Sequence, residues 1–300
     1  MMFKTTALAI LCALWLPLAS VAQIQEEIDK HQEFIAAFTG TSDAETDDVL
    51  GPRSTLKQRR DAAAFLSKRL KRSNLEAQIH EYAYPNIHPI LDLMLPPMRG
   101  VNVYADIQAT TPTDQYIIVG AHYDTAKSSP GADDNASGVA SLLSIAHSLQ
   151  QLSSRSKHYI LVFFDQEEDD SGPGSRTFLA YLIDQGLEIH SMHNIDMIGY
   201  DGNSNRTLEI EAPVSLQDAY VKAADKWEMN LTLVEFNSSD HIPFRRHGID
   251  AVCVGEEVSS GDLNPHYHTD QDTIDYIDFE FLARGTLLIR DVLIELGDAW

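Results

Sequence analysis

Acidic and histidine side chains stand at five places along the chain, each where an apolar run ends or a turn leads into a helical stretch. They are His122 with Asp124, Asp133 with Asp134, Glu167 with Glu168, Asp196, and His266 with His268. Imidazole and carboxylate groups are ligands for Zn²⁺ in proteins, and a carboxylate that binds no metal can act as a general base. One such group alone is better explained by a helix cap or a solvated acid. Five of them at expected strand ends predict a metal site.

Short apolar strands alternate with helical stretches over most of the chain, and these elements must bring the acids and histidines together. The expected strands cover 101–107, 115–120, 159–164, 207–211, 231–236 and 251–254. The expected helices cover 25–38, 54–71, 137–152, 175–183, 215–227 and 279–296. This alternation predicts an α/β fold, a three-layer α/β/α sandwich around a mostly parallel mixed sheet. Sheets of this kind bind ligands just beyond the carboxyl ends of their strands.

The first 22 residues have the pattern of a secretory signal peptide. Lys4 precedes a short apolar run, and small residues, Ser20 and Ala22, stand at the positions that signal peptidase requires. The apolar run is shorter than the roughly 20 residues that a membrane span needs. We therefore expect cleavage after Ala22, export to the periplasm or the medium, and no integral membrane segment in the mature chain. The remaining residues, 23–300, are expected to form one domain with a helical lead (23–100) and a core (101–300) that carries the five groups.

Charge and cysteine content narrow the functional classes further. The 300 residues include 22 Lys and Arg against 45 Asp and Glu, a formal net charge of −23. Such a surface repels phosphate backbones, so we expect no nucleic-acid partner. After cleavage Cys253 is the one cysteine left in the chain as given, and its apolar surroundings predict a small buried hydrophobic residue rather than a nucleophile.

Five motifs together resemble the secreted dizinc aminopeptidases of the MH clan, bacterial leucyl aminopeptidase-like enzymes related to the animal-type glutaminyl cyclases. The motifs are HYDT at 122–125, PGADDNASG at 130–138, the Glu167-Glu168 pair, NIDMIGY at 194–200 and YHTDQDT at 267–273. They occur in the family's order and at its approximate spacing, from about residue 101 to the C-terminus. The resemblance implies a zinc peptidase domain that hydrolyses N-terminal residues from peptides with a free amino group.

The resemblance also implies a ligand set for two zinc ions, with Co²⁺ and Mn²⁺ as alternatives. His122 would bind one ion and His268 the other, and Asp133 would bridge them. Glu168 and Asp196 would each complete the ligands of one ion. The family further places a cis peptide bond between the two acids that match Asp133 and Asp134.

Two catalytic roles follow from the same resemblance. Glu167 matches the family's general base, which takes a proton from the attacking water and passes it to the leaving amine. Glu167 and Glu168 can converge on one site only if the strand before them has already ended, because neighbours on a strand point to opposite faces. Asp124 would orient the His122 imidazole.

Other candidates are assigned less directly. Asp240 and His241 lie in a segment, SDHIPF, that resembles one near the family's substrate pocket, although a helix cap at Asp240 and a surface His241 explain them equally well. His266 is the alternative to His268 as a ligand. Asp165 and Asp170 receive no role and are expected to be solvated.

Two other functions remain open from the sequence. A glutaminyl cyclase is a zinc acyltransferase that closes an N-terminal glutamine, and FFDQEE at 163–168 resembles cyclases somewhat. A catalytically silent, peptidase-like binding domain is the third alternative. Some family members stabilise the oxyanion with a tyrosine just before the SDH segment, where this chain has Phe236 and no tyrosine, so that donor is not assigned.

Overall fold

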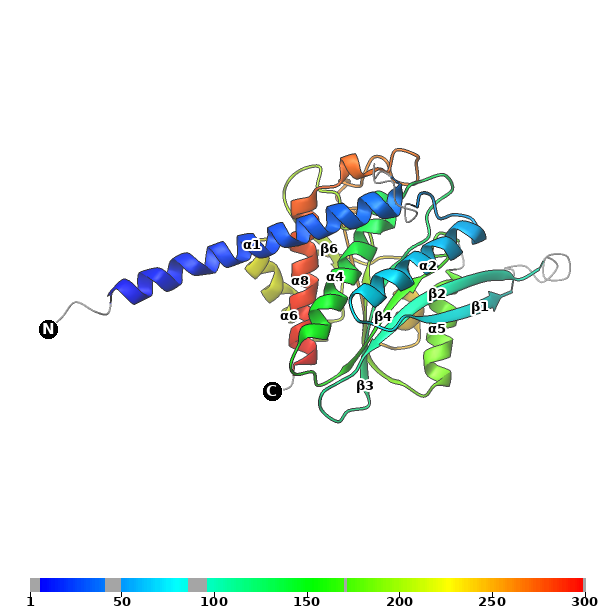
Figure 1. The fold of residues 1–300 in the computed structure, drawn as a ribbon, viewed down its shortest axis with the longest axis horizontal. Helices are drawn as coiled ribbons and strands as arrows, with labels where there is room; N and C mark the ends of the chain where they lie inside the picture. Colours follow the sequence, from blue (N-terminus) through cyan, green and yellow to red (C-terminus); the bar gives the residue numbers. More distant parts are fainter. Residues whose placement is uncertain (1–5, 41–49, 86–95, 170–171, 299–300) are drawn as a thin grey trace.

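The structure is a computed structural model that describes residues 6–40, 50–85, 96–169 and 172–298, with side chains from residue 20 onward. Its centre is one eight-stranded sheet in the order β1-β2-β4-β3-β5-β8-β6-β7. Figure 1 shows the path of the chain, with helices lying across this sheet. The strands are β1 Gln78–Tyr84, β2 Met98–Ile107, β3 Gln115–His122, β4 His158–Phe164, β5 Glu188–Ile195, β6 Thr207–Glu211, β7 Asn230–Leu233 and β8 Ala251–Gly255. The middle of this sheet is parallel, since β4, β3, β5 and β8 all run in one direction. Antiparallel pairs flank it, β1 with β2 and β2 with β4 on one side and β6 with β8 on the other.

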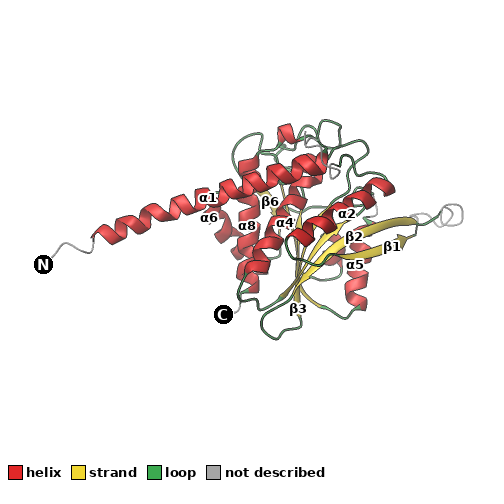
Figure 2. Ribbon diagram, viewed as in Figure 1, coloured by secondary structure: helices red, strands yellow, loops and turns green. Residues whose placement is uncertain are grey.

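Helices cover both faces of the sheet and make it the middle layer of a sandwich (Figure 2). The helices are α1 Thr6–Thr39, α2 Leu56–Arg72, α4 Gly138–Gln151, α5 Pro173–Asp184, α6 Val214–Trp227, α7 Ile242–Arg246 and α8 Phe279–Gly297, with the short π-helical turn η1 Ala132–Ser137 and the 3₁₀ turn η2 Ile274–Tyr276. The larger apolar core joins one sheet face to α1, α2, α4, α6 and α8, and a smaller one joins the other face to α5 and α7. Along β3, Ile117 and Val119 belong to the larger core and Ile118 to the smaller one, as the alternation of strand side chains requires. The predicted three-layer α/β/α sandwich is confirmed.

Most expected elements are present, and two strands are additional. The segment 23–100, expected to be helical, also contains β1 and the start of β2. β5 is absent from the strands that the sequence predicts, but it spans eight residues and lies at the centre of the sheet. The expected strand at 231–236 is shorter and ends at Leu233.

The predicted signal peptide, 1–22, lies almost entirely outside the residues whose side chains are described. Within the described residues, no helix combines the length and the apolar composition that crossing a membrane requires.

Candidate metal and active site

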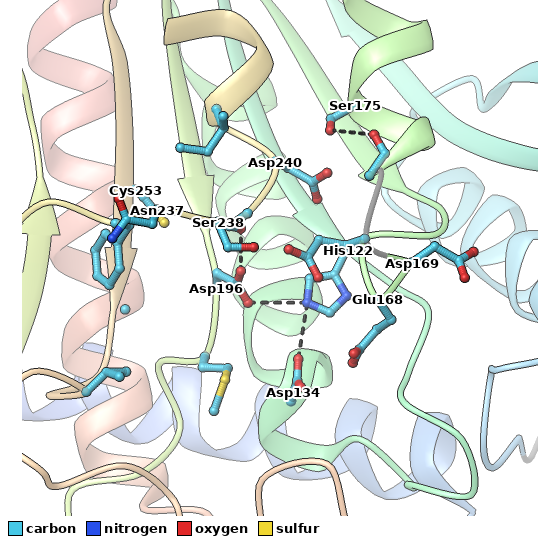
Figure 3. Close-up of a pocket in the computed structure, with 18 of the residues that line it drawn as sticks. His122, Asp134, Glu168, Asp169, Ser175, Asp196, Asn237, Ser238, Asp240 and Cys253 are labelled. Atoms are coloured by element: carbon cyan, nitrogen blue, oxygen red, sulfur yellow. Dashed lines mark hydrogen bonds and ion pairs between the residues drawn. The ribbon is translucent and has the colours of Figure 1, made fainter. Parts of the chain in front are cut away.

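Three neighbouring parallel strands deliver polar side chains to the same edge of the sheet. β3 ends at His122, β4 ends shortly before Glu167 and Glu168, and β5 ends just before Asp196. These strands run in one direction, so their carboxyl ends meet at one edge. The close-up in Figure 3 shows His122 between Asp196 and Glu168, with Asp134 from the turn η1 below it.

Two groups of potential ligands share one aspartate. The Nε2 atom of His122 lies 3.1 Å from Asp134 Oδ1 and 3.2 Å from Asp196 Oδ1. The Nε2 atom of His268 lies 3.2 Å from Asp134 Oδ2 and 2.9 Å from Glu168 Oε2. Each oxygen of Asp134 therefore belongs to a different group, and within each group the ligand atoms lie within 4.8 Å of one another. A carboxylate with one oxygen in each group can bridge two cations.

The prediction that Asp133 is the bridging acid is wrong, because its carboxylate is already occupied elsewhere. Asp133 is fully buried, and it accepts hydrogen bonds from the Gly199 amide at 2.9 Å and from Asn264 Nδ2 at 2.9 Å. Asp134 has φ −102° and ψ 91°, which takes it out of the helical turn and directs its side chain to the histidines. The cis peptide bond likewise follows Asp134, joining it to Asn135, rather than Asp133.

The donor set fits two dications. Each group supplies one imidazole, one carboxylate of its own and the shared carboxylate, which are ligand types that Zn²⁺ accepts. Burial and the neighbouring Asp134 carboxylate raise the pKa of Glu168 to about 10. Burial opposes a charge on His122, but Asp196, Asp124 and Asp134 outweigh it and raise the pKa of His122 well above its usual range. Crowded carboxylates of this kind are stabilised by bound cations.

Asp124 connects the first group to the glutamate pair. Its Oδ1 atom lies 3.4 Å from His122 Nδ1, on the side of the ring away from Asp134. The same carboxylate accepts the amide hydrogen bonds of Glu167 at 3.1 Å and of Glu168 at 3.3 Å. Asp124 thus lies against the imidazole and binds the backbone of the glutamate turn, which is the position that the orienting role predicted for it requires.

Glu167 lies in the pocket and belongs to neither ligand group. Strand β4 has ended three residues earlier, and Gln166 adopts a left-handed φ of 63°, so Glu167 and Glu168 both reach the site. Burial, with Asp196 and Asp240 as further causes, raises the pKa of Glu167 well above its usual range. A carboxylate that is not a ligand but faces the ligands has the position that a general base needs.

The turn before Glu167 rests on side chains that the sequence analysis did not identify. Asp165 is buried, not solvated as expected, and forms an ion pair of 2.6 Å with Arg59 Nε of helix α2. Its carboxylate accepts the Val101 amide, and Tyr82 of β1 donates to the Asp165 carbonyl at 2.9 Å. Asp170 lies outside the described residues.

Asp272 is a second acid whose position the sequence analysis missed. It is fully buried, and its two oxygens accept the amide hydrogen bonds of Asp133 and Asp134 at 3.0 and 3.1 Å. It lies four residues after His268, in the YHTDQDT motif, so it links two ligand-bearing segments. The YHTDQDT motif points to this segment, but it does not indicate which of its two acids, Asp270 or Asp272, is buried and binds the amides.

Asp240 and His241 have different surroundings, and neither is a surface residue or caps α7 with its side chain. Asp240 lines the pocket near Ser175 (Figure 3). Burial raises the pKa of Asp240 to about 7. His241 faces Glu211, with 3.3 Å between Nε2 and Oε2, and does not line the pocket.

The pocket is lined by both acidic and apolar side chains, and its volume is about 610 Å³. The apolar lining residues include Met197, Phe236, Ile242, Val258 and Leu263. Cys253, buried as expected, also lines the pocket.

His266 and His268 have different aromatic neighbours. Tyr267 lines the pocket beside His268, and burial with the adjacent acids raises the pKa of its phenol, which keeps the O–H group as a donor. The ring of His266 instead packs against Tyr276, with 3.8 Å between centroids, and belongs to neither ligand group. The structure thus places His268, rather than His266, with the other ligands.

Solved structures confirm the fold of this chain. A zinc aminopeptidase from Bacillus subtilis, BSAP, superposes with a TM-score of 0.78 over 91% of this chain and 95% of its own, at 16% identity. A glutaminyl cyclase from Porphyromonas gingivalis superposes with a TM-score of 0.71 over 90% of this chain and 98% of its own, at 23% identity. Both likenesses concern the fold, which aminopeptidases and cyclases share.

Sequence comparison gives the family. Aminopeptidase YwaD of Bacillus subtilis (strain 168) is 31% identical over 187 residues, 60% of this chain and 40% of that protein. Probable leucine aminopeptidase 1 of Trichophyton verrucosum (strain HKI 0517) is 28% identical over 215 residues, 64% of this chain and 57% of that protein. The aligned region thus spans about two fifths to three fifths of the length of these relatives. The profile of Peptidase family M28 matches residues 102–293, which include all the ligand candidates, and the chain belongs to this family.

Proposed function

We propose that this protein is a dizinc aminopeptidase that removes N-terminal residues from peptides. The observation that carries the proposal is the sharing of Asp134 between two ligand groups in a pocket that Glu167 also lines. Histidines and acids in this arrangement would hold two Zn²⁺ ions, which supply Lewis-acid polarisation of the scissile carbonyl and activation of water.

The protein's own side chains divide the remaining work. Glu167 takes a proton from the attacking water and passes it to the nitrogen of the leaving amine, so one carboxylate serves as base and then as acid. Asp124 holds the backbone of Glu167 in place through the amide hydrogen bond. Tyr267 keeps its phenolic proton and is available to donate to the carbonyl oxygen as negative charge develops there.

The lining of the pocket supports a substrate with an apolar first residue. The apolar lining residues Met197, Phe236, Ile242, Val258 and Leu263 suit a side chain such as that of leucine. The acids that also line the pocket suit a free amino group, which is positively charged at neutral pH. Relatives at 26–28% identity carry the name leucine aminopeptidase, in agreement with this preference.

One experiment separates the three functions. Peptides that begin with leucine, lysine, aspartate or glutamine are incubated with the zinc-loaded protein, and the products are identified by mass spectrometry. Loss of the first residue, fastest for leucine and abolished by a chelator, supports the aminopeptidase. Loss of ammonia from the glutamine peptide alone would identify a cyclase, and unchanged peptides would identify a binding domain.

We also propose that residues 1–22 direct export and are removed. The support is the sequence pattern of Lys4, the short apolar run and the small residues before Gln23. N-terminal sequencing of the protein recovered from the periplasm or the medium tests this. The expected first residue is Gln23, and a chain that stays in the cytoplasm with its N-terminus intact would contradict export.

A further inference from the structure

Arg53 is a buried arginine bound almost entirely by backbone carbonyl groups. Its side chain is 1% exposed and lies just before helix α2. The guanidinium donates to the carbonyls of Tyr123, Pro130 and Gly131 at 2.6, 2.8 and 3.0 Å. Two more bonds reach the carbonyls of Gly51 and Phe38 at 3.1 and 3.2 Å. Within the described residues it forms no ion pair, and besides the peptide dipoles this charge meets the ring of Phe38, whose centroid lies 4.3 Å from Arg53 Cζ.

Three of these carbonyls belong to the loop that joins two metal-ligand candidates. Tyr123 directly follows His122, and Gly131 lies three residues before Asp134. The backbone amide of Arg53 also donates to Thr125 Oγ1 at 3.0 Å. The loop 123–131 therefore wraps around the guanidinium, which contacts it near both ends.

The backbone amides of the turn that follows this loop are bound by an acidic residue, Asp272, whose charge is opposite to that of Arg53. Asp272 accepts the amides of Asp133 and Asp134, and its carbonyl accepts the Ala132 amide at 3.2 Å. Arg53 thus binds the carbonyls of the loop, and Asp272 binds the amides of the next turn. Burial lowers the pKa of Arg53 to about 10, and the nearby acids, Asp272 first, oppose a larger fall. The guanidinium therefore stays charged at neutral pH.

We propose that Arg53 is a positioning residue for the metal centre, which it holds preformed through the loop 123–131. The proposal rests on the dizinc function proposed above. The positive charge of Arg53 also offsets the negative charge of the carboxylates around the ligands. Arg53 lies outside residues 102–293, the part that matches the family profile. The segment before residue 102 thus supplies a component of the site, and residues 102–293 alone do not contain the complete site.

The test measures zinc affinity in three variants by competition with a chelator, together with the melting temperature of the metal-free protein. Arg53→Met removes the charge and the hydrogen bonds, and Arg53→Lys keeps the charge but loses the planar fork of donors. Arg155→Met is the matched control, because Arg155 also binds backbone carbonyls, those of Gln108, Leu149 and Leu152, but lies between α4 and β4 at the opposite edge of the sheet.

Arg53→Met is expected to weaken zinc binding at one or both sites by about tenfold or more, the usual effect of losing a group that positions a ligand. Arg155→Met is expected to lower the melting temperature while zinc affinity stays within about twofold of wild type, a change too small for the loss of a positioning group. If Arg53→Met does not fold, the Arg53→Lys variant tests the proposal instead. Its zinc affinity is expected to be several-fold lower than that of wild type.

Two results would overturn the proposal, and they differ in what else they affect. A folded Arg53 variant that binds both zinc ions as tightly as wild type, with only a lower melting temperature, would make Arg53 purely structural and leave the proposed function intact. Wild-type protein that binds no zinc would overturn both proposals together.

Discussion

At the scale of single residues, an acid is available to a metal only if its oxygens are free of other donors. The Asp134 oxygens face the two histidines, whereas Asp133 accepts hydrogen bonds from Gly199 and Asn264. The two residues are adjacent and chemically identical, so the sequence predicts that one of them bridges but cannot say which. The backbone angles of Asp134 decide it, and they depend on the packing of the whole turn.

This difference predicts opposite results for two matched substitutions. Asp134→Asn removes the charge that both groups share, so bound zinc should fall from two ions per chain to one or none. Asp133→Asn places an amide among hydrogen-bond donors and should cost about 1–3 kcal/mol of stability while zinc is retained. Elemental analysis and urea unfolding measure the two effects. Zinc loss in Asp133→Asn alone would restore Asp133 as the bridging acid.

Glu167→Gln tests the general base separately from the metal ligands. The amide has nearly the same shape but cannot accept the proton of the attacking water, so peptide hydrolysis should fall by about 10²–10⁴-fold, the usual contribution of such a group. Bound zinc should stay at the wild-type level, because Glu167 belongs to neither ligand group. Glu76→Gln, at an exposed position, is the control for the loss of one charge. A Glu167→Gln enzyme with near wild-type turnover would rule out this role.

Asp240 should make stability depend on pH. Burial raises its pKa from 3.8 to about 7, so between these values the folded state binds more protons than the unfolded state. The free energy of unfolding therefore falls as pH rises through this window and is level above it. Asp240→Asn cannot ionise, so relative to wild type it should be more stable at pH 8 than at pH 5. Urea unfolding of both metal-free proteins at the two pH values measures this, and an equal difference at both would contradict it.

At the scale of elements, the sequence predicts those whose apolar spacing is regular and misses those that contain polar side chains. β5 contains His190, Ser191 and His193, which form hydrogen bonds to one another, and His193 also bonds to Tyr220 at 2.8 Å. These partners come from tertiary packing, which the sequence does not show. β1 was missed for a different reason, since most of its side chains are partly exposed at the edge of the sheet.

The loop 123–131 gives a prediction at this scale. Gly131 and Gly186 both have left-handed φ values, 64° and 71°. A Cβ at Gly186 would meet open space, whereas one at Gly131 would overlap the Thr125 methyl group and lie 2.7 Å from Arg53 Nη2. Gly186→Ala should therefore cost about 1 kcal/mol for the backbone alone. Gly131→Ala should cost clearly more and weaken zinc binding, and equal costs in thermal unfolding would show that the loop adapts.

At the scale of the whole molecule, the fold concentrates negative charge at one edge of the sheet. The chain carries a net charge of −23, and the pocket is lined by Asp134, Glu167, Glu168, Asp196 and Asp240. The sequence predicts both the acidity and the α/β architecture, because each follows from composition and from the alternation of elements. It does not predict that Arg53 and Arg59, which precede the matched region, lie behind this edge, since long-range contacts of this kind depend on the tertiary arrangement.

This concentration of charge predicts how metal removal and salt act together. The metal-free protein retains the repulsion among these acids, whereas two dications add four positive charges at their centre. Zinc at about 100 times the dissociation constant of each site should add about 2.7 kcal/mol per site to the free energy of unfolding, or about 5.4 kcal/mol for two sites. Raising NaCl from about 0.01 to about 0.3 M screens charge repulsion, so it should raise the melting temperature of the metal-free protein more than that of the zinc-loaded protein. Thermal unfolding in the four conditions measures this. Equal salt effects in both forms would show that these acids are neutralised by protons when zinc is absent.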